Sequence, residues 1–243
     1  MQLRVLIGDI TKCKVDAIVN SANPTLLGGG GVDGAIHKAA GVGLSAECRG
    51  FRGCPVGEAR LTKGFRLPAK YVIHTAGPIW VGGRRNEEKQ LASCYTSALN
   101  IAREKHFSHI AFAAISIGAN RYPVNRAVSV AITTIMNESA GIDRIDLICS
   151  DKSIQTAYSQ AAVAFWLEQL AEASQAELSE MLKEAMPSLV MLCRAEEEPS
   201  PLKLANEIES VKVLLQPFLS MPRHCGPIDM NQAAKQILDS IES

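Results

Sequence analysis

The chain has 243 residues, and 47% of them are hydrophobic, which is enough to bury the core of one large domain or of a domain with an appendage. Its 25 basic and 25 acidic residues cancel. This balance argues against nucleic acid or an anionic membrane as a partner, because such surfaces are recognised through an excess of positive charge.

The cysteine pattern indicates reduced thiols that pack in the core. The seven cysteines are odd in number, widely scattered and contain no C-x-x-C pair: Cys13, Cys48, Cys54, Cys94, Cys149, Cys193 and Cys225. A disulfide framework or a zinc cluster is therefore not expected. The first apolar run is too short for a signal peptide, and none approaches the roughly 20 residues of a membrane span. We expect a cytoplasmic location.

Short apolar runs recur along the first 150 residues, with helix-periodic segments between several of them. The runs are LRVLI, DAIV, KYVIHTA, HIAFAAI and IDLIC. They have the length and composition of buried strands, and their alternation with helices predicts an α/β fold whose sheet is covered by helices.

Two helices are predicted from apolar stripes at helical spacing. In the segment 86–106 the stripe consists of Leu91, Tyr95, Ala98 and Ala102. Over 153–170 the apolar face consists of Ile154, Tyr158, Ala161, Phe165 and Trp166. Both faces are expected to cover the sheet.

After about Leu170 the strand signals become rare and three helical segments follow, at 171–186, 200–219 and 229–243. We therefore predict a main domain over 1–172 and a helical C-terminal extension over 173–243. No motif in the extension indicates chemistry. A packing role or a surface for a partner is the expectation.

Four consecutive glycines at 28–31 separate an asparagine-containing turn from the helix-like run 32–40. Formally, 29–34 matches G-x-G-x-x-G, but that fingerprint must follow a strand directly. The preceding strand is expected to end near Asn20, and the seven residues 21–27 intervene before the glycines. A Walker A loop is excluded because no Gly-Lys-Ser/Thr follows.

Two interpretations of the glycines remain. Exposed N–H groups at a helix N-terminus form an anion site, and a diphosphate suits it. A flexible glycine linker is the alternative. The linker does not explain why Asn20, Asn23 and Asp33 surround the glycines.

Several long motifs resemble the macrodomain family, specifically the MacroD-type branch that includes bacterial O-acetyl-ADP-ribose deacetylases. They are GDITKCKVDAIVNSANPTLLGGGGVDGAIHKAAG, the following EC, and GCPVGEARLTKGFRLPAKYVIHTAGPIW. The resemblance runs from about Leu3 to Leu170. It implies a three-layer α/β/α sandwich with a mixed central sheet that binds ADP-ribose at the ends of its strands.

The resemblance also implies roles for single residues. Asp9 would accept a hydrogen bond from the adenine amino group, and the Ile10 N–H would touch the ring. Asn20 would tie the loop to the sheet. The diphosphate and distal ribose would be wrapped by backbone amides of Gly28, Gly29, Gly30, Gly31 and Val32.

For catalysis, the resemblance points to Asp33 as the general base or water-orienting carboxylate, and to Asn23 as the group that fixes a hydroxyl of the distal ribose. Read without the resemblance, Asp33 is an acid favoured by the helix dipole, Asn23 is a turn residue before proline, and Asp9 caps a turn. His37 and His74 fit packing better than catalysis, because no nearby Ser or Cys partner is indicated.

A second phosphate loop departs from the family pattern, Ser-Thr-Gly-Val/Ile-Tyr/Phe-Gly-Tyr/Phe-Pro, at four of eight positions. This chain has Ser116, Ile117, Gly118, Ala119, Asn120, Arg121, Tyr122 and Pro123. Asn120 replaces an aromatic that would stack beside the distal ribose, and Arg121 replaces a glycine. We expect altered shielding from water and altered backbone geometry, or an Arg121 contact with a phosphate.

Two functions of different class follow. The first is a hydrolase that removes acetyl from O-acetyl-ADP-ribose or mono-ADP-ribose from acidic side chains of proteins, without cofactor or metal, since the zinc motif Ser-x-His-x-Cys-His of another macrodomain branch is absent. The second is a module that binds ADP-ribose without turnover, favoured by the divergent second loop. A nicotinamide oxidoreductase is a distant third.

Overall fold

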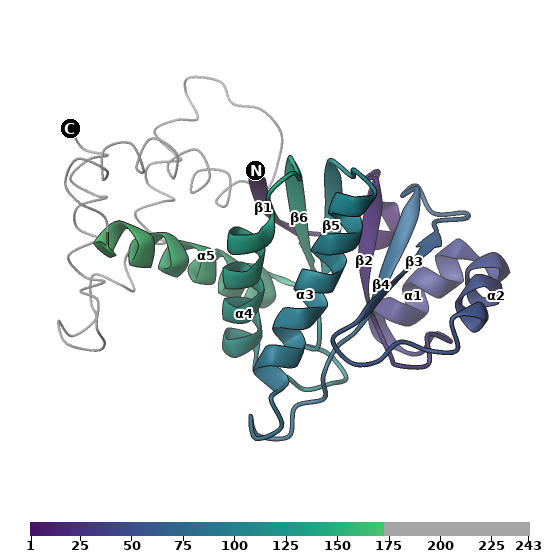
Figure 1. Ribbon diagram of the computed structural model, residues 1–243, viewed down its shortest axis with the longest axis horizontal. Helices are drawn as coiled ribbons and strands as arrows, with labels where there is room; N and C mark the ends of the chain where they lie inside the picture. Colours follow the sequence, from purple (N-terminus) through teal and green to yellow (C-terminus); the bar gives the residue numbers. More distant parts are fainter. Residues whose placement is uncertain (173–243) are drawn as a thin grey trace. The chain divides into compact units, whose positions relative to one another are not determined.

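The computed structural model describes residues 1–172, with side chains to residue 165. One sheet of six strands has the order β1-β6-β5-β2-β4-β3 (Figure 1). The strands are β1 Gln2–Ile7, β2 Ala17–Ala22, β3 Ala59–Lys63, β4 Tyr71–Ala76, β5 His109–Ala113 and β6 Arg144–Cys149. Five strands are parallel, and β3 runs antiparallel to β4.

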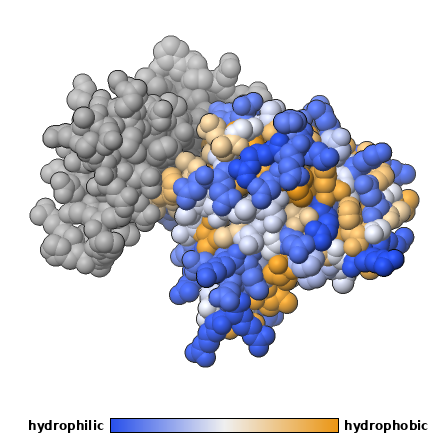
Figure 2. Space-filling view, in the orientation of Figure 1, coloured by the Kyte–Doolittle hydropathy of each residue, from blue (hydrophilic) through white to orange (hydrophobic). Residues whose placement is uncertain are grey.

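The helices follow the strands along the chain. They are η1 Ile10–Lys12, α1 Gly31–Ala40, α2 Val42–Gly50, α3 Glu87–Glu104, α4 Val124–Glu138 and α5 Lys152–Glu172. No helix of the described part is long and apolar enough to cross a bilayer. On the face shown in Figure 2, hydrophilic residues surround smaller apolar areas.

The sheet is the middle of three layers, because alternate residues of its strands point to opposite faces. One face carries Ile18 and Val72, and packs with Ile36 of α1 and Leu44 of α2 in a single buried cluster. The opposite face carries Phe112, whose ring lies 5.3 Å from that of Tyr95 on α3. The predicted α/β/α sandwich with a mixed sheet is confirmed.

Most predicted elements appear in the structure. All five predicted strands form, and the predicted stripe of α3 is fully buried. Strand β2 extends to Ala22, two residues beyond the expected end near Asn20, so five residues separate it from Gly28. Strand β3 was not predicted, because its sequence ARLTK contains two cations and no apolar run.

The chain divides into two compact units, Met1–Ala157 and Tyr158–Ser243. The whole sheet and α1 to α4 belong to the first unit. The domain boundary predicted after residue 172 stays a prediction, and the helices predicted within 173–243 lie outside the described residues. The described cysteines are free thiols: Cys13, Cys48, Cys54, Cys94 and Cys149.

A partly buried ion pair joins neighbouring strands of the sheet. Arg4 and Asp146 are register partners on β1 and β6, and the guanidinium donates two hydrogen bonds of 2.7 Å to the carboxylate. His109 Nε2 lies 2.8 Å from the same carboxylate. Burial acts to raise the pKa of Asp146, but the hydrogen bonds and charges of Arg4 and His109 outweigh it and hold the pKa below its ordinary value.

We expect Asp146→Ala to lower the free energy of unfolding by about 3 kcal/mol near pH 7, because it removes the buried carboxylate that pairs with both Arg4 and His109. A carboxyl with a lowered folded pKa stabilises the fold above its unfolded pKa of about 4, and this contribution is lost as the pH falls through the folded value. Urea unfolding of both proteins between pH 7 and pH 3 measures the difference.

The difference in free energy of unfolding between the natural chain and Asp146→Ala should therefore become smaller below about pH 4. Asp143→Ala is the control, because Asp143 is exposed beside the same strand. A difference that stays constant down to pH 3 would contradict this assignment.

Candidate functional site

The loops that carry the predicted site residues leave the sheet at the carboxyl ends of its parallel strands. Strands β1, β2, β4, β5 and β6 are mutually parallel, so the loops after them leave from the same end of the sheet. In open α/β sheets, ligands bind in the crevice outside the carboxyl ends of the strands. The loop 8–10, the glycine loop 23–30 and the second loop 114–123 all begin there.

Asn23 organises the glycine loop. Its Oδ1 accepts hydrogen bonds from the backbone N–H groups of Thr25 and Leu26, at 2.9 and 3.1 Å, and its Nδ2 donates to the Gly28 carbonyl at 2.8 Å. An asparagine that bonds its own following backbone builds a local turn. The loop conformation therefore depends on this side chain.

The glycines leave the backbone of this loop uncovered. Gly28 and Gly31 have φ values of 82° and 60°, in the left-handed region that favours glycine. A Cβ on Gly29 would lie 3.6 Å from Asp33 Oδ2, and a Cβ on Gly30 or Gly31 would meet open space. Gly30 is the N-cap of α1 and offers no capping side chain, so the first N–H groups of the helix are available to an anion.

Asp33 is a buried carboxylate in the first turn of α1, with 5% of its surface exposed. Its Oδ1 accepts a hydrogen bond of 2.7 Å from Asn20 Nδ2, and its Oδ2 lies 3.4 Å from Asn23 Nδ2. His37 Nε2, one turn along the helix, is 3.5 Å from Oδ1. These contacts fix the orientation of a carboxylate beside the glycine loop.

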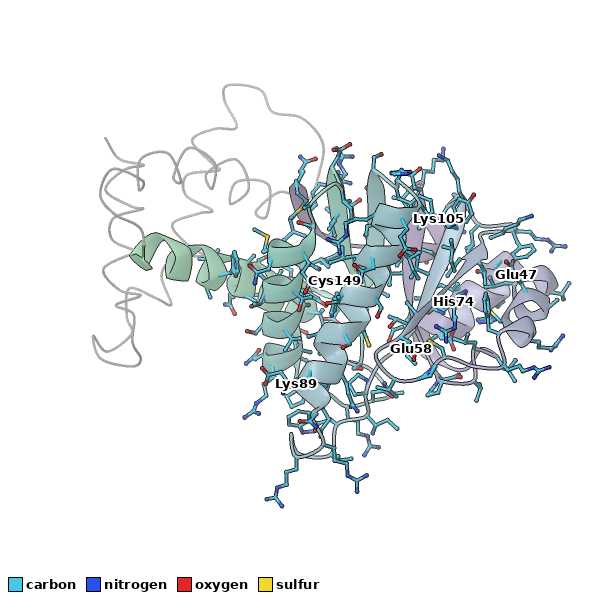
Figure 3. All side chains as sticks on the ribbon, in the orientation of Figure 1. Glu47, Glu58, His74, Lys89, Lys105 and Cys149 are labelled. Carbon is cyan, nitrogen blue, oxygen red and sulfur yellow. The ribbon has the colours of Figure 1, made fainter. Side chains whose placement is uncertain are left out.

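The two histidines belong to the same polar cluster. His74 on β4 is fully buried and points to the α1 side of the sheet (Figure 3). Its Nδ1 lies 3.1 Å from Asn20 Nδ2, and its Nε2 lies 3.0 Å from Thr62 Oγ1. Burial, and secondarily the charge of His37, lower the pKa of His74 to about 3.

Packing alone is thus an incomplete description of His37 and His74. His37 Nδ1 is 3.1 Å from Ser45 Oγ, and its ring centroid is 6.0 Å from that of His74. We call Asn20, Asp33, His37, Thr62 and His74 the Asp33 network. The sequence holds one signal for it, because Asp33 and His37 are four residues apart on a helix and so share a face.

One group in the described part of the chain has the spacing of metal ligands. One ligand atom each from His37, Cys48 and His74 lies within 4.8 Å of the others. Both ring nitrogens of His74 already have hydrogen-bond partners in Asn20 and Thr62, and burial raises the pKa of Cys48 to about 11 and favours the thiol. A metal requires a thiolate and a free nitrogen lone pair, so hydrogen bonding describes this group better.

Asp9 caps the short helix η1. Its Oδ1 accepts hydrogen bonds from the backbone N–H and the hydroxyl of Thr11, at 2.9 and 2.6 Å, and these bonds lower the pKa of Asp9. The side chain of Ile10 is buried in the core. The interpretation of Asp9 as a turn cap is confirmed, and contacts of Asp9 and Ile10 with adenine stay predictions.

The divergent second loop is closed by its own backbone. Tyr122 N–H donates to the Ser116 carbonyl at 3.1 Å, and Arg121 N–H donates to the Gly118 carbonyl at 2.9 Å. Arg121 has φ of 54°, so the arginine adopts the left-handed conformation that favours glycine. The exposed Ala119 and the half-buried Ile117 lie in the same turn.

Asn120 ties this loop to the segment after β4. Its Nδ2 donates to the Gly77 carbonyl at 2.9 Å, while its backbone carbonyl accepts from Trp80 N–H at 2.9 Å. The centroid of the Trp80 ring lies 4.6 Å from that of Tyr122, and Arg126 lies 5.5 Å from the Trp80 centroid. Nothing in the sequence singles out Trp80, because only the fold brings residues 80 and 120 together.

We expect Gly34→Ala to destabilise the fold by about 2 kcal/mol, because a Cβ at this position would lie 2.2 Å from the Gly29 carbonyl oxygen. Gly50→Ala is the matched control, since a Cβ on this helical residue of α2 meets nothing within 4 Å. Urea unfolding measures both. Equal free energies of unfolding of the two variants would contradict this prediction, because the loop would then accommodate the added Cβ without loss of stability.

Comparison with known proteins gives relatives along most of the described chain. A family model described as Macro domain matches residues 19–131. A macro domain-containing protein of Lactiplantibacillus plantarum is 49% identical over 168 residues, covering 68% of this chain and 98% of that protein. The ADP-ribose glycohydrolase MACROD2 of Xenopus laevis is 56% identical over 129 residues, covering 53% of this chain and 31% of that protein.

Similar solved structures are also macrodomains. A macrodomain variant of Oceanobacillus iheyensis with ADP-ribose has a TM-score of 0.63 and 37% identity, and the match covers 68% of this chain and 92% of that one. A Trypanosoma brucei macrodomain in complex with ADP-ribose has a TM-score of 0.60 and 38% identity, with 65% and 67% covered.

Proposed function

The chain belongs to the macrodomain family, and on that premise we propose that it binds ADP-ribose and hydrolyses an ester bond at the distal ribose. The substrates would be O-acetyl-ADP-ribose, or proteins that carry mono-ADP-ribose on acidic side chains. The observation that carries the proposal is the buried carboxylate of Asp33, held by two asparagine amides beside an uncovered glycine loop.

Binding of the diphosphate is supported by the N-terminus of α1. A helix N-terminus preceded by glycines attracts an anion through backbone N–H groups and the helix dipole, with no need for a basic patch. This agrees with the zero net charge of the chain. Relatives in solved structures hold ADP-ribose. We propose that the loop 28–32 wraps the diphosphate and the distal ribose.

Hydrolysis requires a group that orients a water molecule and takes its proton. In the proposal Asp33 Oδ2 has this role, because a Cβ on Gly29 would lie 3.6 Å from it and glycine leaves that approach open. Asn23 acts by fixing the loop, since its Nδ2 is bonded to the Gly28 carbonyl. Its contact with a ribose hydroxyl remains part of the proposal.

The second candidate function, binding without turnover, is favoured by Asn120. Its amide bonds the Gly77 carbonyl, so no aromatic ring from this position covers the distal ribose. A site more open to water positions its substrate less rigidly, and a misplacement of about 1 Å can cost about a hundredfold in rate. We propose a cytoplasmic location for either function, in line with the free cysteines of the described part.

Release of free ADP-ribose from a protein mono-ADP-ribosylated on glutamate tests the function. We expect turnover by the natural chain, and a loss of at least about 100-fold in Asp33→Ala with ADP-ribose still bound in calorimetry. O-acetyl-ADP-ribose is assayed in parallel. Tight binding by the natural chain without turnover of either substrate would overturn the hydrolase and leave the binding module.

Arg121 gives a test of the second loop. If its guanidinium contacts a phosphate, Arg121→Gly should weaken ADP-ribose binding by about tenfold and reduce the salt dependence of the affinity. Arg52→Gly is the matched control, because Arg52 is also exposed and has φ of 55° outside both loops. Equal affinities of the two variants would remove Arg121 from the binding site.

A further inference from the structure

We infer that His74 is a positioning residue for Asp33, acting through the side-chain amide of Asn20; the inference rests on the proposed function of Asp33. The three residues come from two strands and a helix. Asn20 and His74 are register partners on the parallel strands β2 and β4, and Asp33 lies in the first turn of α1. Asn20 and His74 are fully buried.

The direction of each hydrogen bond follows from the carboxylate. An ionised Asp33 only accepts, so the Asn20 atom 2.7 Å from its Oδ1 must be the amide nitrogen. The second N–H of that amide then donates to His74 Nδ1, at 3.1 Å. Asn20 Oδ1 has no partner among the described residues, so acceptance by Asp33 and His74 sets the orientation of the amide.

The chain of bonds continues to the edge of the sheet. Because Nδ1 of His74 accepts, its Nε2 carries the proton and donates to Thr62 Oγ1 at 3.0 Å. Thr62 in turn donates to the Val72 carbonyl at 3.4 Å. Each donor and acceptor between Asp33 and β3 is thus assigned: the Asn20 amide donates to both Asp33 and His74, and His74 donates to Thr62. Reversing the Asn20 amide would turn its oxygen toward the carboxylate.

These hydrogen bonds give His74 a role beyond packing. Without an acceptor at Nδ1, the Asn20 amide keeps only its bond to Asp33, and the orientation of this donor is less firmly set. The other titratable groups that face the network are His37 on α1 and Cys48 on α2, while Asn23 and Thr62 are uncharged.

Two variants distinguish the loss of the hydrogen-bond acceptor Nδ1 from the loss of the imidazole ring of His74. His74→Leu removes the acceptor, whereas the side-chain oxygen of His74→Asn replaces Nδ1. Thr75→Val is the matched control, because Thr75 is the next buried residue of β4 and loses a bond to the Glu58 carbonyl on the opposite face. Thermal unfolding and ADP-ribose binding establish that each variant is folded.

We expect His74→Leu to lower kcat by at least about tenfold, with a change of less than about threefold in ADP-ribose affinity. The side-chain ¹⁵N–¹H signals of Asn20, recorded without substrate, should shift as well, because one N–H of the amide loses its acceptor. His74→Asn and Thr75→Val should leave kcat and the Asn20 signals in place. A folded His74→Leu with unmoved Asn20 signals would overturn the inference.

A measurement on the natural chain keeps the test decisive if His74→Leu does not fold. The ¹⁵N shifts of the His74 ring should show a proton on Nε2 and none on Nδ1, without titration between pH 5 and 8. A proton on Nδ1 would overturn the inference. Because neither NMR readout needs turnover, an absence of hydrolysis would refute the proposed function alone.

Discussion

The hydrogen bond between Asn20 and Asp33 is the constraint on which the rest of the site depends. It joins the central strand β2 to the first turn of α1, at 2.7 Å, in a fully buried position. A buried amide and a buried carboxylate are each costly without partners, and here the Asn20 amide nitrogen donates to the carboxylate, while Asn20 Oδ1 has no partner among the described residues. The position of α1 relative to the sheet is therefore fixed at the point where the glycine loop ends.

This constraint explains why the loop ends in glycines. Once α1 is anchored by Asp33, the chain must leave β2, turn within the eight residues 23–30 and enter the helix while its backbone stays accessible. Gly28 and Gly31 provide left-handed turns, and Gly34 accommodates the Gly29 carbonyl, which would lie 2.2 Å from any Cβ. Glycine loses more backbone entropy on folding than other residues, but it leaves the N–H groups of this loop exposed to a ligand.

The second loop follows a different design. Besides its own backbone hydrogen bonds, it is held by Asn120 and by contact of Tyr122 with Trp80. Glu87 orders the neighbouring segment, because its carboxylate accepts hydrogen bonds from the N–H groups of Val81, Gly83 and Arg85. The second loop is therefore tied to the segment after β4, whereas the glycine loop is held by bonds from Asn23 within the loop itself.

The sequence predicted the fold from local patterns. The apolar runs of β2 and β5 and the stripe of α3 have the periods of the elements they form, whereas the anion site indicated by the glycines before Asp33 stays a prediction. Register across the sheet was not predictable, because nothing local pairs Asn20 with His74 or Thr62 with Val72. For the same reason His74 was taken as packing, and the bond from Asn120 to Gly77 was not foreseen.

A double-mutant cycle between Asn20 and Asp33 tests the central constraint most directly. The free energy of unfolding is measured for the natural chain, Asn20→Ala, Asp33→Ala and the double variant. A hydrogen bond to a buried carboxylate predicts a coupling energy of about 1.5–3 kcal/mol between the two positions. Additivity within about 0.3 kcal/mol would contradict the account, because Asn20 and Asp33 would then contribute to the stability of the fold independently.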